Sequence, residues 1–191
     1  LSLQMSVDKL SACFLFALFL LTFAVSLYSI GYLRHYYGKR QVGLFNFLYA
    51  VFILSMVMVI TAANTPFFFL SWEIMSVVSY FLAVFEHEKQ ETVKAGTLYV
   101  IMTHVAAAFL MIAFMTVFSY TGTFDMQADT SVMPLAAQNA VFVLFLIGFG
   151  TKAGMIPLHI WLPKAHPAAA SNVSALMSGV MINTAVYGLL R

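Results

Sequence analysis

Runs of about twenty uncharged, mostly apolar residues alternate along this chain with short clusters of charge. At ~1.5 Å per residue, a helix of that length crosses the ~30 Å hydrocarbon layer of a membrane. Only 8% of the residues are charged, whereas a soluble globular domain carries roughly 25%. The runs must be helices, because an open strand would leave backbone groups unsatisfied in lipid. The sequence therefore predicts an all-α, polytopic membrane helical bundle.

Six such runs predict six transmembrane helices in a single transmembrane domain covering residues 1–191. The predicted spans are residues 10–33, 44–63, 66–85, 95–120, 139–160 and 173–190. The fifth span contains Pro157, which removes a backbone donor and clashes with the carbonyl four residues earlier. We therefore predict that this helix is broken between Lys152 and Pro157.

The basic residues of the loops favour one orientation. They gather in alternate loops: Arg34, Lys39 and Arg40 after the first span, Lys89 and Lys94 after the third, and Lys164 after the fifth. The loop after the fourth span instead carries Asp125 and Asp129 with no lysine or arginine. The positive-inside rule places the basic loops in the cytoplasm. Both ends of the chain are then expected outside.

Two ionisable residues interrupt otherwise uncharged spans. Lys152 is the only fixed charge between residues 139 and 161, and Glu73 is the only acid in the third span. A charge at the centre of a membrane helix costs at least ~2.5 to 3.5 kcal/mol, so it usually has a partner and a function. We predict that the two residues form a buried pair on a proton or ion path. The alternatives are a lysine that snorkels to the interface and a carboxylate kept neutral by burial.

The pair also suggests a switch. An ammonium group that loses its carboxylate partner in a membrane is expensive to keep charged. We hypothesise that a redox-driven rearrangement separates Glu73 from Lys152, so that the lysine releases its proton to the next group.

A long motif spans the predicted break. The run is Gly148-Phe-Gly-Thr-Lys-Ala-Gly-Met-Ile-Pro-Leu-His-Ile-Trp-Leu-Pro-Lys-Ala-His166, and it is accompanied by Ser174-Ala-Leu-Met-Ser-Gly and by Trp72-Glu73. Together these resemble the antiporter-like, proton-translocating membrane subunits. That family includes the large membrane subunits of respiratory complex I, the Mrp antiporters, and the membrane subunits of formate hydrogenlyase and hydrogenase-4. The continuation after Ser174 is most similar to the hydrogenase branch.

The resemblance implies a function and a setting. The six spans would correspond to helices three to eight of the family, which form the first of its two inverted repeats, with Glu73 as its glutamate and Lys152 as its pumping lysine. The chain would be the first half-channel of a proton-translocating subunit in a membrane-bound hydrogenase or complex I-like oxidoreductase. It would lie in a bacterial or archaeal cytoplasmic membrane beside other membrane subunits and a hydrophilic redox arm. We expect no catalytic chemistry and no cofactor in the chain itself.

Three histidines are further candidates for proton translocation. His104 lies near the middle of the fourth span, where it is either a relay member or a neutral hydrogen-bonding group between helices. In the family, the positions of His159 and His166 imply a role near proton uptake, although both could simply anchor the interface. The five histidines lack the spacing of metal ligands, so no metal site is predicted. No basic face that could bind nucleic acid is evident either.

Three positions depart from the family pattern. Ala170 stands where many relatives have proline, and Ser178 and Asn183 occupy positions where many relatives carry lysine or histidine. Neither serine nor asparagine carries a proton charge, so the relay beyond Lys152 would need water.

Two other functions remain open from the sequence. One is an Mrp-type module that exchanges sodium for protons through the same buried pair. The other is a non-transporting membrane anchor for a redox arm.

Overall fold

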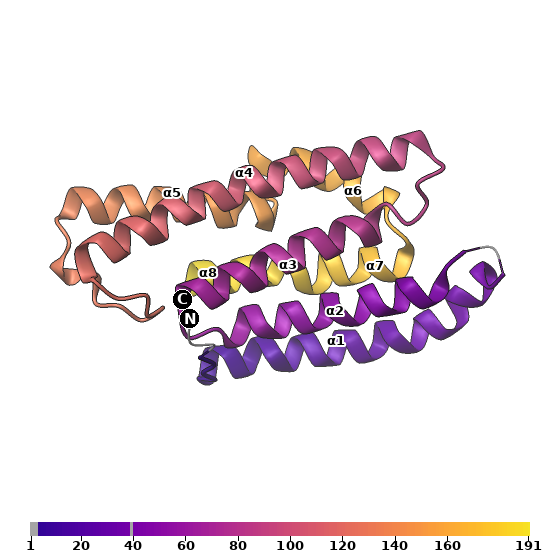
Figure 1. Ribbon diagram of the computed structural model, residues 1–191, viewed down its shortest axis with the longest axis horizontal. Coiled ribbons are helices and arrows are strands. Elements are labelled where there is room, and N and C mark those ends of the chain that lie inside the picture. Colours follow the sequence, from indigo (N-terminus) through magenta and orange to yellow (C-terminus); the bar gives the residue numbers. More distant parts are fainter. Residues whose placement is uncertain (1–3, 39) are drawn as a thin grey trace.

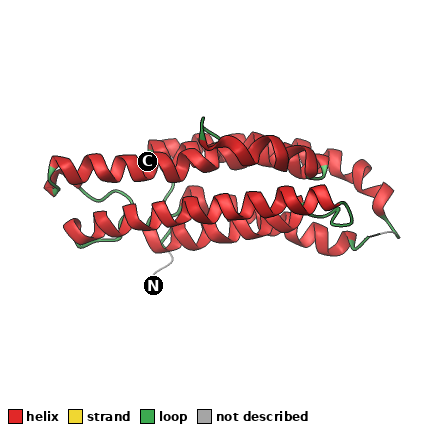
Figure 2. Cartoon of the chain, turned by 90° about the horizontal axis from the view of Figure 1, so that it is seen from above, coloured by secondary structure: helices red, strands yellow, loops and turns green. Residues whose placement is uncertain are grey.

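The chain folds into an elongated bundle of helices (Figure 1). The structure, a computed structural model, describes residues 4–38 and 40–191. Among these residues, six helical segments are long and apolar enough to cross a membrane, which confirms the predicted all-α, six-helix architecture. Figure 2 shows that the helices run along the long axis of the molecule. Lys39, one of the predicted loop cations, lies outside the described residues.

The first four membrane helices are α1 (Lys9–Leu33), α2 (Val42–Thr61), α3 (Thr65–Ala83) and α4 (Gln90–Thr121). Local sequence signals set the ends of α3 and α4. The Asn64 side chain caps α3 by accepting from the Phe67 N–H at 2.9 Å. Gly122, with a φ of 68°, ends α4 in the left-handed conformation that glycine adopts without strain. These helices pack in order, α2 on α3 and α3 on α4.

The fifth membrane segment is broken, as predicted. Helix α5 (Leu135–Ala153) ends at Gly154, and a 3₁₀ turn (Leu158–Trp161) and α6 (Leu162–Ala168) follow. The indole N–H of Trp161 donates to the Thr151 carbonyl at 2.7 Å, which satisfies a carbonyl group near the end of α5.

The last segment, predicted as a helical span over residues 173–190, has an irregular centre. It consists of α7 (Ser171–Leu176), a π-helical turn (Met177–Met181) and α8 (Ile182–Leu190). Helix α8 packs on α5, and α7 packs on α1. The Arg191 guanidinium contacts the Asp8 carboxylate, so the end of α8 lies beside the start of α1, while α4 and α5 extend further in that direction (Figure 1).

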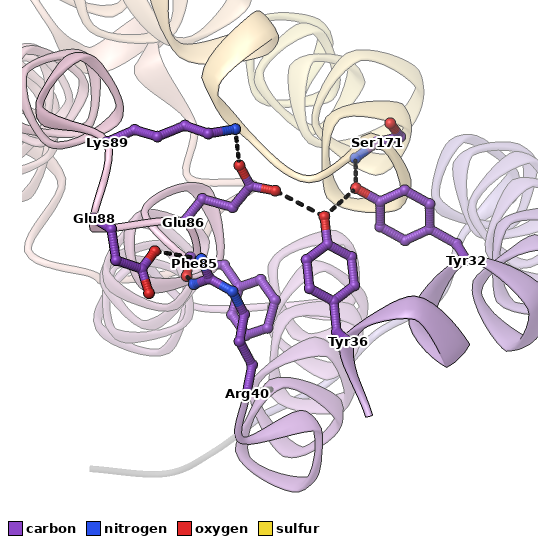
Figure 3. Close-up of polar contacts among 8 residues, drawn as sticks. All are labelled: Tyr32, Tyr36, Arg40, Phe85, Glu86, Glu88, Lys89 and Ser171. Atoms are coloured by element: carbon purple, nitrogen blue, oxygen red, sulfur yellow. Dashed lines mark hydrogen bonds and ion pairs between the residues drawn. The ribbon is translucent and has the colours of Figure 1, made fainter. Parts of the chain in front are cut away.

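A polar cluster ties three segments together near the loops that follow α1 and α3 (Figure 3). The Tyr36 hydroxyl donates to Glu86 at 2.7 Å, and Lys89 contacts the other oxygen of the same carboxylate. The Tyr32 and Tyr36 hydroxyls lie 3.2 Å apart, and the Ser171 N–H donates to Tyr32 at 3.4 Å. The hydrogen bond from Lys89, followed by that from Tyr36, lowers the pKa of Glu86. The cluster thus joins the end of α1 and the α3–α4 loop to the start of α7.

Gly148 allows α4 and α5 to approach closely, and its replacement is expected to destabilise the bundle. A Cβ at this position would lie 2.5 Å from Leu110 Cδ2 and 3.0 Å from the Ala106 carbonyl oxygen. Overpacking of this kind costs about 1 to 3 kcal/mol. Gly148→Val should therefore lower the melting temperature in detergent, measured by circular dichroism. The matched control is Gly31→Val in α1, where nothing lies within 4 Å of the added carbon. Equal melting temperatures for the two variants would contradict the prediction.

Candidate functional site

Lys152 lies at the centre of the bundle in the last turn of α5. Its side chain is 0% exposed. The Nζ atom donates to the Ser76 and Tyr99 hydroxyl oxygens, each at 2.9 Å. It also lies 5.1 Å from the centre of the Tyr99 ring and 5.7 Å from that of Trp72, within the range of cation–π attraction. The nearest groups to this amine are therefore hydroxyls and aromatic rings.

The Tyr99 hydroxyl connects the lysine to two further segments. It lies 2.6 Å from the Ser79 hydroxyl oxygen and 3.4 Å from the Met181 sulfur in the π-helical turn. Ser79 in turn donates to the Ser76 carbonyl of α3 at 2.9 Å. Because that bond uses the Ser79 proton, the Ser79 oxygen is left to accept from Tyr99. The result is a directed chain of hydrogen bonds from the lysine through Tyr99 to the backbone of α3.

Glu73 of α3 and His104 of α4 form a second polar pair. Glu73 Oε2 lies 3.5 Å from His104 Nε2, and the side chains are 27% and 50% exposed. His104 Nδ1 lies 2.8 Å from the Val100 carbonyl oxygen, so this nitrogen carries a proton. In the neutral imidazole, Nε2 then has only a lone pair and would face the lone pairs of the carboxylate. The pair is attractive only when either Nε2 or Glu73 holds one more proton.

The Lys152 site and the Glu73–His104 pair both include residues of α3, but Glu73 is not an ion-pair partner of the lysine in the described structure. Among the described side chains, no carboxylate forms an ion pair with Lys152. Ser76, which accepts from the lysine, follows Glu73 by three residues and so lies on the same face of α3. The Glu73 Oε1 atom and the Trp72 indole nitrogen are buried without a protein hydrogen-bond partner in the described part of the chain. One turn of α3 therefore separates Glu73 from Ser76, the residue whose hydroxyl the lysine contacts.

The other two histidines lie beyond the break in the fifth segment. His159 is in the 3₁₀ turn and His166 is in α6, where its Nδ1 lies 3.5 Å from the Ser174 hydroxyl oxygen. Trp161 stands between this region and the lysine, with ring centres 4.9 Å from Tyr99 and 6.2 Å from His166. The structure therefore brings Glu73 together with His104, and separates both from His159 and His166.

Ser76 and Tyr99 are the site residues that the sequence analysis missed. Hydroxyl side chains are common in membrane helices as interhelical hydrogen-bonding groups, so neither stands out from the sequence. The spacing of three residues between Glu73 and Ser76 was the one available signal. Nothing in the sequence indicated that Tyr99 would lie against the lysine.

Comparison with known families settles what kind of chain this is. Residues 62–191 match the transmembrane family described as NADH:quinone oxidoreductase/Mrp antiporter. The chain belongs to this family. Residues 1–41 also match the N-terminus of chain 5 of NADH-ubiquinone oxidoreductase, complex I. The resemblance to antiporter-like membrane subunits that the sequence predicted is confirmed.

Two curated relatives of this antiporter-like chain cover its whole length. It is 41% identical over 191 residues to hydrogenase-4 component B of Escherichia coli (strain K12), with 99% of the chain and 28% of the relative aligned. It is 34% identical over 196 residues to NAD(P)H-quinone oxidoreductase chain 4 2 of Microcystis aeruginosa (strain NIES-843 / IAM M-2473), with 100% of the chain and 34% of the relative aligned. The chain thus spans about a third of these relatives or less.

Two solved structures share the fold of this antiporter-like chain. One is the membrane-bound sulfane sulfur reductase, an archaeal respiratory membrane complex, with a TM-score of 0.86 at 18% identity over 98% of this chain and 38% of that one. The other is the Mrp complex from Dietzia sp. DQ12-45-1b, with a TM-score of 0.82 at 24% identity over 97% of this chain and 34% of that one. At these identities the likeness concerns the fold alone.

Proposed function

We propose that this chain is a proton-translocating module, the first half-channel of an antiporter-like subunit in a membrane-bound hydrogenase or complex I-like redox complex. Lys152 would be the central proton carrier. Glu73 and His104 would form a neighbouring proton-holding pair, and His159 and His166 would lie on the uptake side. The kinship to hydrogenase-4 component B supports the hydrogenase setting. Other membrane subunits and a hydrophilic redox arm would complete the complex, and both ends of the described chain would face outside.

The observation that carries this proposal is the set of partners around Lys152. The amine is fully buried, and its two hydrogen-bond partners are the hydroxyls of Ser76 and Tyr99. The Ser76 proton goes to the Trp72 carbonyl and the Tyr99 proton to Ser79, so both hydroxyl oxygens accept from the lysine. An ammonium has three N–H donors and a neutral amine has two, so either form can donate to both oxygens. The same two partners can therefore satisfy the side chain before and after it loses a proton. A lysine locked to a carboxylate would lack this property.

The position of Glu73 suggests how the lysine would be controlled. The carboxylate is one turn of α3 away from the hydroxyl that the lysine contacts. In our hypothesis of a separable pair, this arrangement corresponds to the state in which the lysine releases its proton. Approach of the carboxylate would stabilise the ammonium form, because opposite charges attract strongly in a medium of low dielectric constant. Movement of α3 relative to α5 would then couple to uptake and release.

Ion dependence distinguishes this proposal from its two alternatives. The intact complex should be reconstituted in vesicles and driven by its electron donor, with internal acidification followed by a pH-sensitive dye. Acidification that is the same with and without sodium supports proton translocation. Acidification that requires a sodium gradient would favour the Mrp-type alternative, because the matched family includes Mrp antiporters. Electron transfer without any acidification would favour the anchor.

A further inference from the structure

A hollow lined by lysines lies between α4 and α6, away from the buried site. It has a volume of about 610 Å³, and its lysines are Lys89, Lys94 and Lys164. They come from three different places: the α3–α4 loop, the first turns of α4, and α6. Apolar side chains, including Leu98 and Pro167, line the same hollow. One carboxylate, Glu91, also lines it, so the three lysines leave an excess of positive charge beside apolar surface. The proposed proton path uses none of these residues.

We propose that this hollow binds the phosphate group of an anionic phospholipid whose acyl chains lie along α4 and α6. Basic pockets between membrane helices are the sites at which acidic headgroups bind. The proposal goes beyond the function proposed above and does not depend on it. A lipid fits better than a soluble phosphate, because Leu98 and Pro167 offer acyl chains a contact that an inorganic ion cannot use.

The depth of the hollow supports a headgroup. Helix α4 has 32 residues and is about 48 Å long at ~1.5 Å per residue, whereas the hydrocarbon layer is ~30 Å thick. Its first turns, which carry Lys94, therefore extend into the interfacial region where lipid phosphates lie. The loop that holds Lys89 lies still further out.

Two of the three lysines, Lys94 and Lys164, are available to bind a phosphate. The Lys94 Nζ atom lies 3.5 Å from Glu91, but both side chains are mostly exposed, and an exposed pair of this kind contributes little. Lys89 contacts Glu86, whose side chain is only 18% exposed, in the polar cluster of Figure 3, and we expect it to contribute less. Lys164 forms no ion pair with any side chain that the structure describes. We therefore expect Lys164 and Lys94 to contribute most.

Native mass spectrometry of the intact protein in detergent tests this inference. Phosphatidylglycerol and phosphatidylcholine are added at equal ratios, and the lipid retained by each variant is compared. Lys94→Ala/Lys164→Ala should lower phosphatidylglycerol retention by roughly 25-fold, about fivefold for each lysine, and leave phosphatidylcholine retention unchanged. Lys9→Ala, at the start of α1 and outside the lining of the hollow, is the matched control for Lys164→Ala. The charge reversal Lys164→Glu provides a second variant if the double substitution folds poorly.

Two results would overturn the proposal. One is equal phosphatidylglycerol retention by Lys164→Ala and Lys9→Ala. The other is complete displacement of the lipid by inorganic phosphate at the same concentration, which would assign the hollow to a soluble anion. A variant of these lysines that loses lipid but translocates protons normally would still support the lipid site. Failure of one proposal is therefore distinguishable from failure of the other.

Discussion

Replacing Lys152 with alanine should reduce redox-driven proton transfer by the intact complex by at least about a hundredfold, the scale on which a positioned proton-transfer group acts. Among the described residues, the substitution removes the one lysine, arginine, histidine or carboxylate side chain that is fully buried, at 0% exposure. Ser76 and Tyr99 would remain as neighbours, but neither hydroxyl exchanges a proton readily near neutral pH. The measurement is dye-monitored acidification of vesicles at matched rates of electron transfer.

The hydrogen bonds around Lys152 predict that the variant still folds. Without the amine, Ser76 still donates to the Trp72 carbonyl at 2.9 Å, and Tyr99 keeps its contact with Ser79. Lys152→Met restores most of the lost volume without a charge, so it separates the effect of a cavity from that of the missing proton carrier. Lys9→Ala, an exposed lysine at the start of α1, is the matched control. Proton transfer that survives in both Lys152 variants would rule out the lysine as carrier, and loss of the assembled complex would favour the anchor.

The sequence predicted the architecture because one physical rule dominates it. A backbone in lipid must satisfy its own hydrogen bonds, so apolar length alone marks each helix. The same rule says little about where a helix extends into water. Helix α4 begins at Gln90, whereas the predicted span begins at residue 95, because hydropathy cannot distinguish a polar turn of helix from a loop. The π-helical turn at Met177–Met181 likewise has no apolar pattern of its own.

The free-energy cost of burying a charge can be read from the sequence, whereas the contacts that the charged side chain makes cannot. The cost of burying a charge identified Lys152 and Glu73 without any knowledge of the fold. The contacts depend on the depth and rotation of each helix, which a uniformly apolar helix does not encode. Charge therefore suggested a direct pair, whereas the structure places Ser76 and Tyr99 against the lysine. The partner of Glu73 is His104, whose nearest charged neighbour in the sequence is ten residues away at Lys94.

Replacing Glu73 with glutamine should lower proton transfer on the order of tenfold, less than the loss of Lys152. Glutamine has nearly the same shape, and its amide can donate to the lone pair of His104 Nε2, so the contact between α3 and α4 should persist. What disappears is the carboxylate, whose Oε2 atom lies 3.5 Å from His104 Nε2. The reduction is partial because the His104 imidazole remains at the same place.

The control for this prediction is a carboxylate of the same helical bundle that has no such neighbour. Glu91 lies in the first turn of α4, and its side chain is 89% exposed, so Glu91→Gln should leave proton transfer unchanged. Combining Glu73→Gln with His104→Gln removes both titratable groups and should bring the loss close to that of Lys152→Ala. If the double variant transfers protons as fast as the parent while Lys152→Ala does not, Glu73 and His104 only join α3 to α4. The path would then reach the lysine through another element, and the break beside Trp161 would be the next place to test.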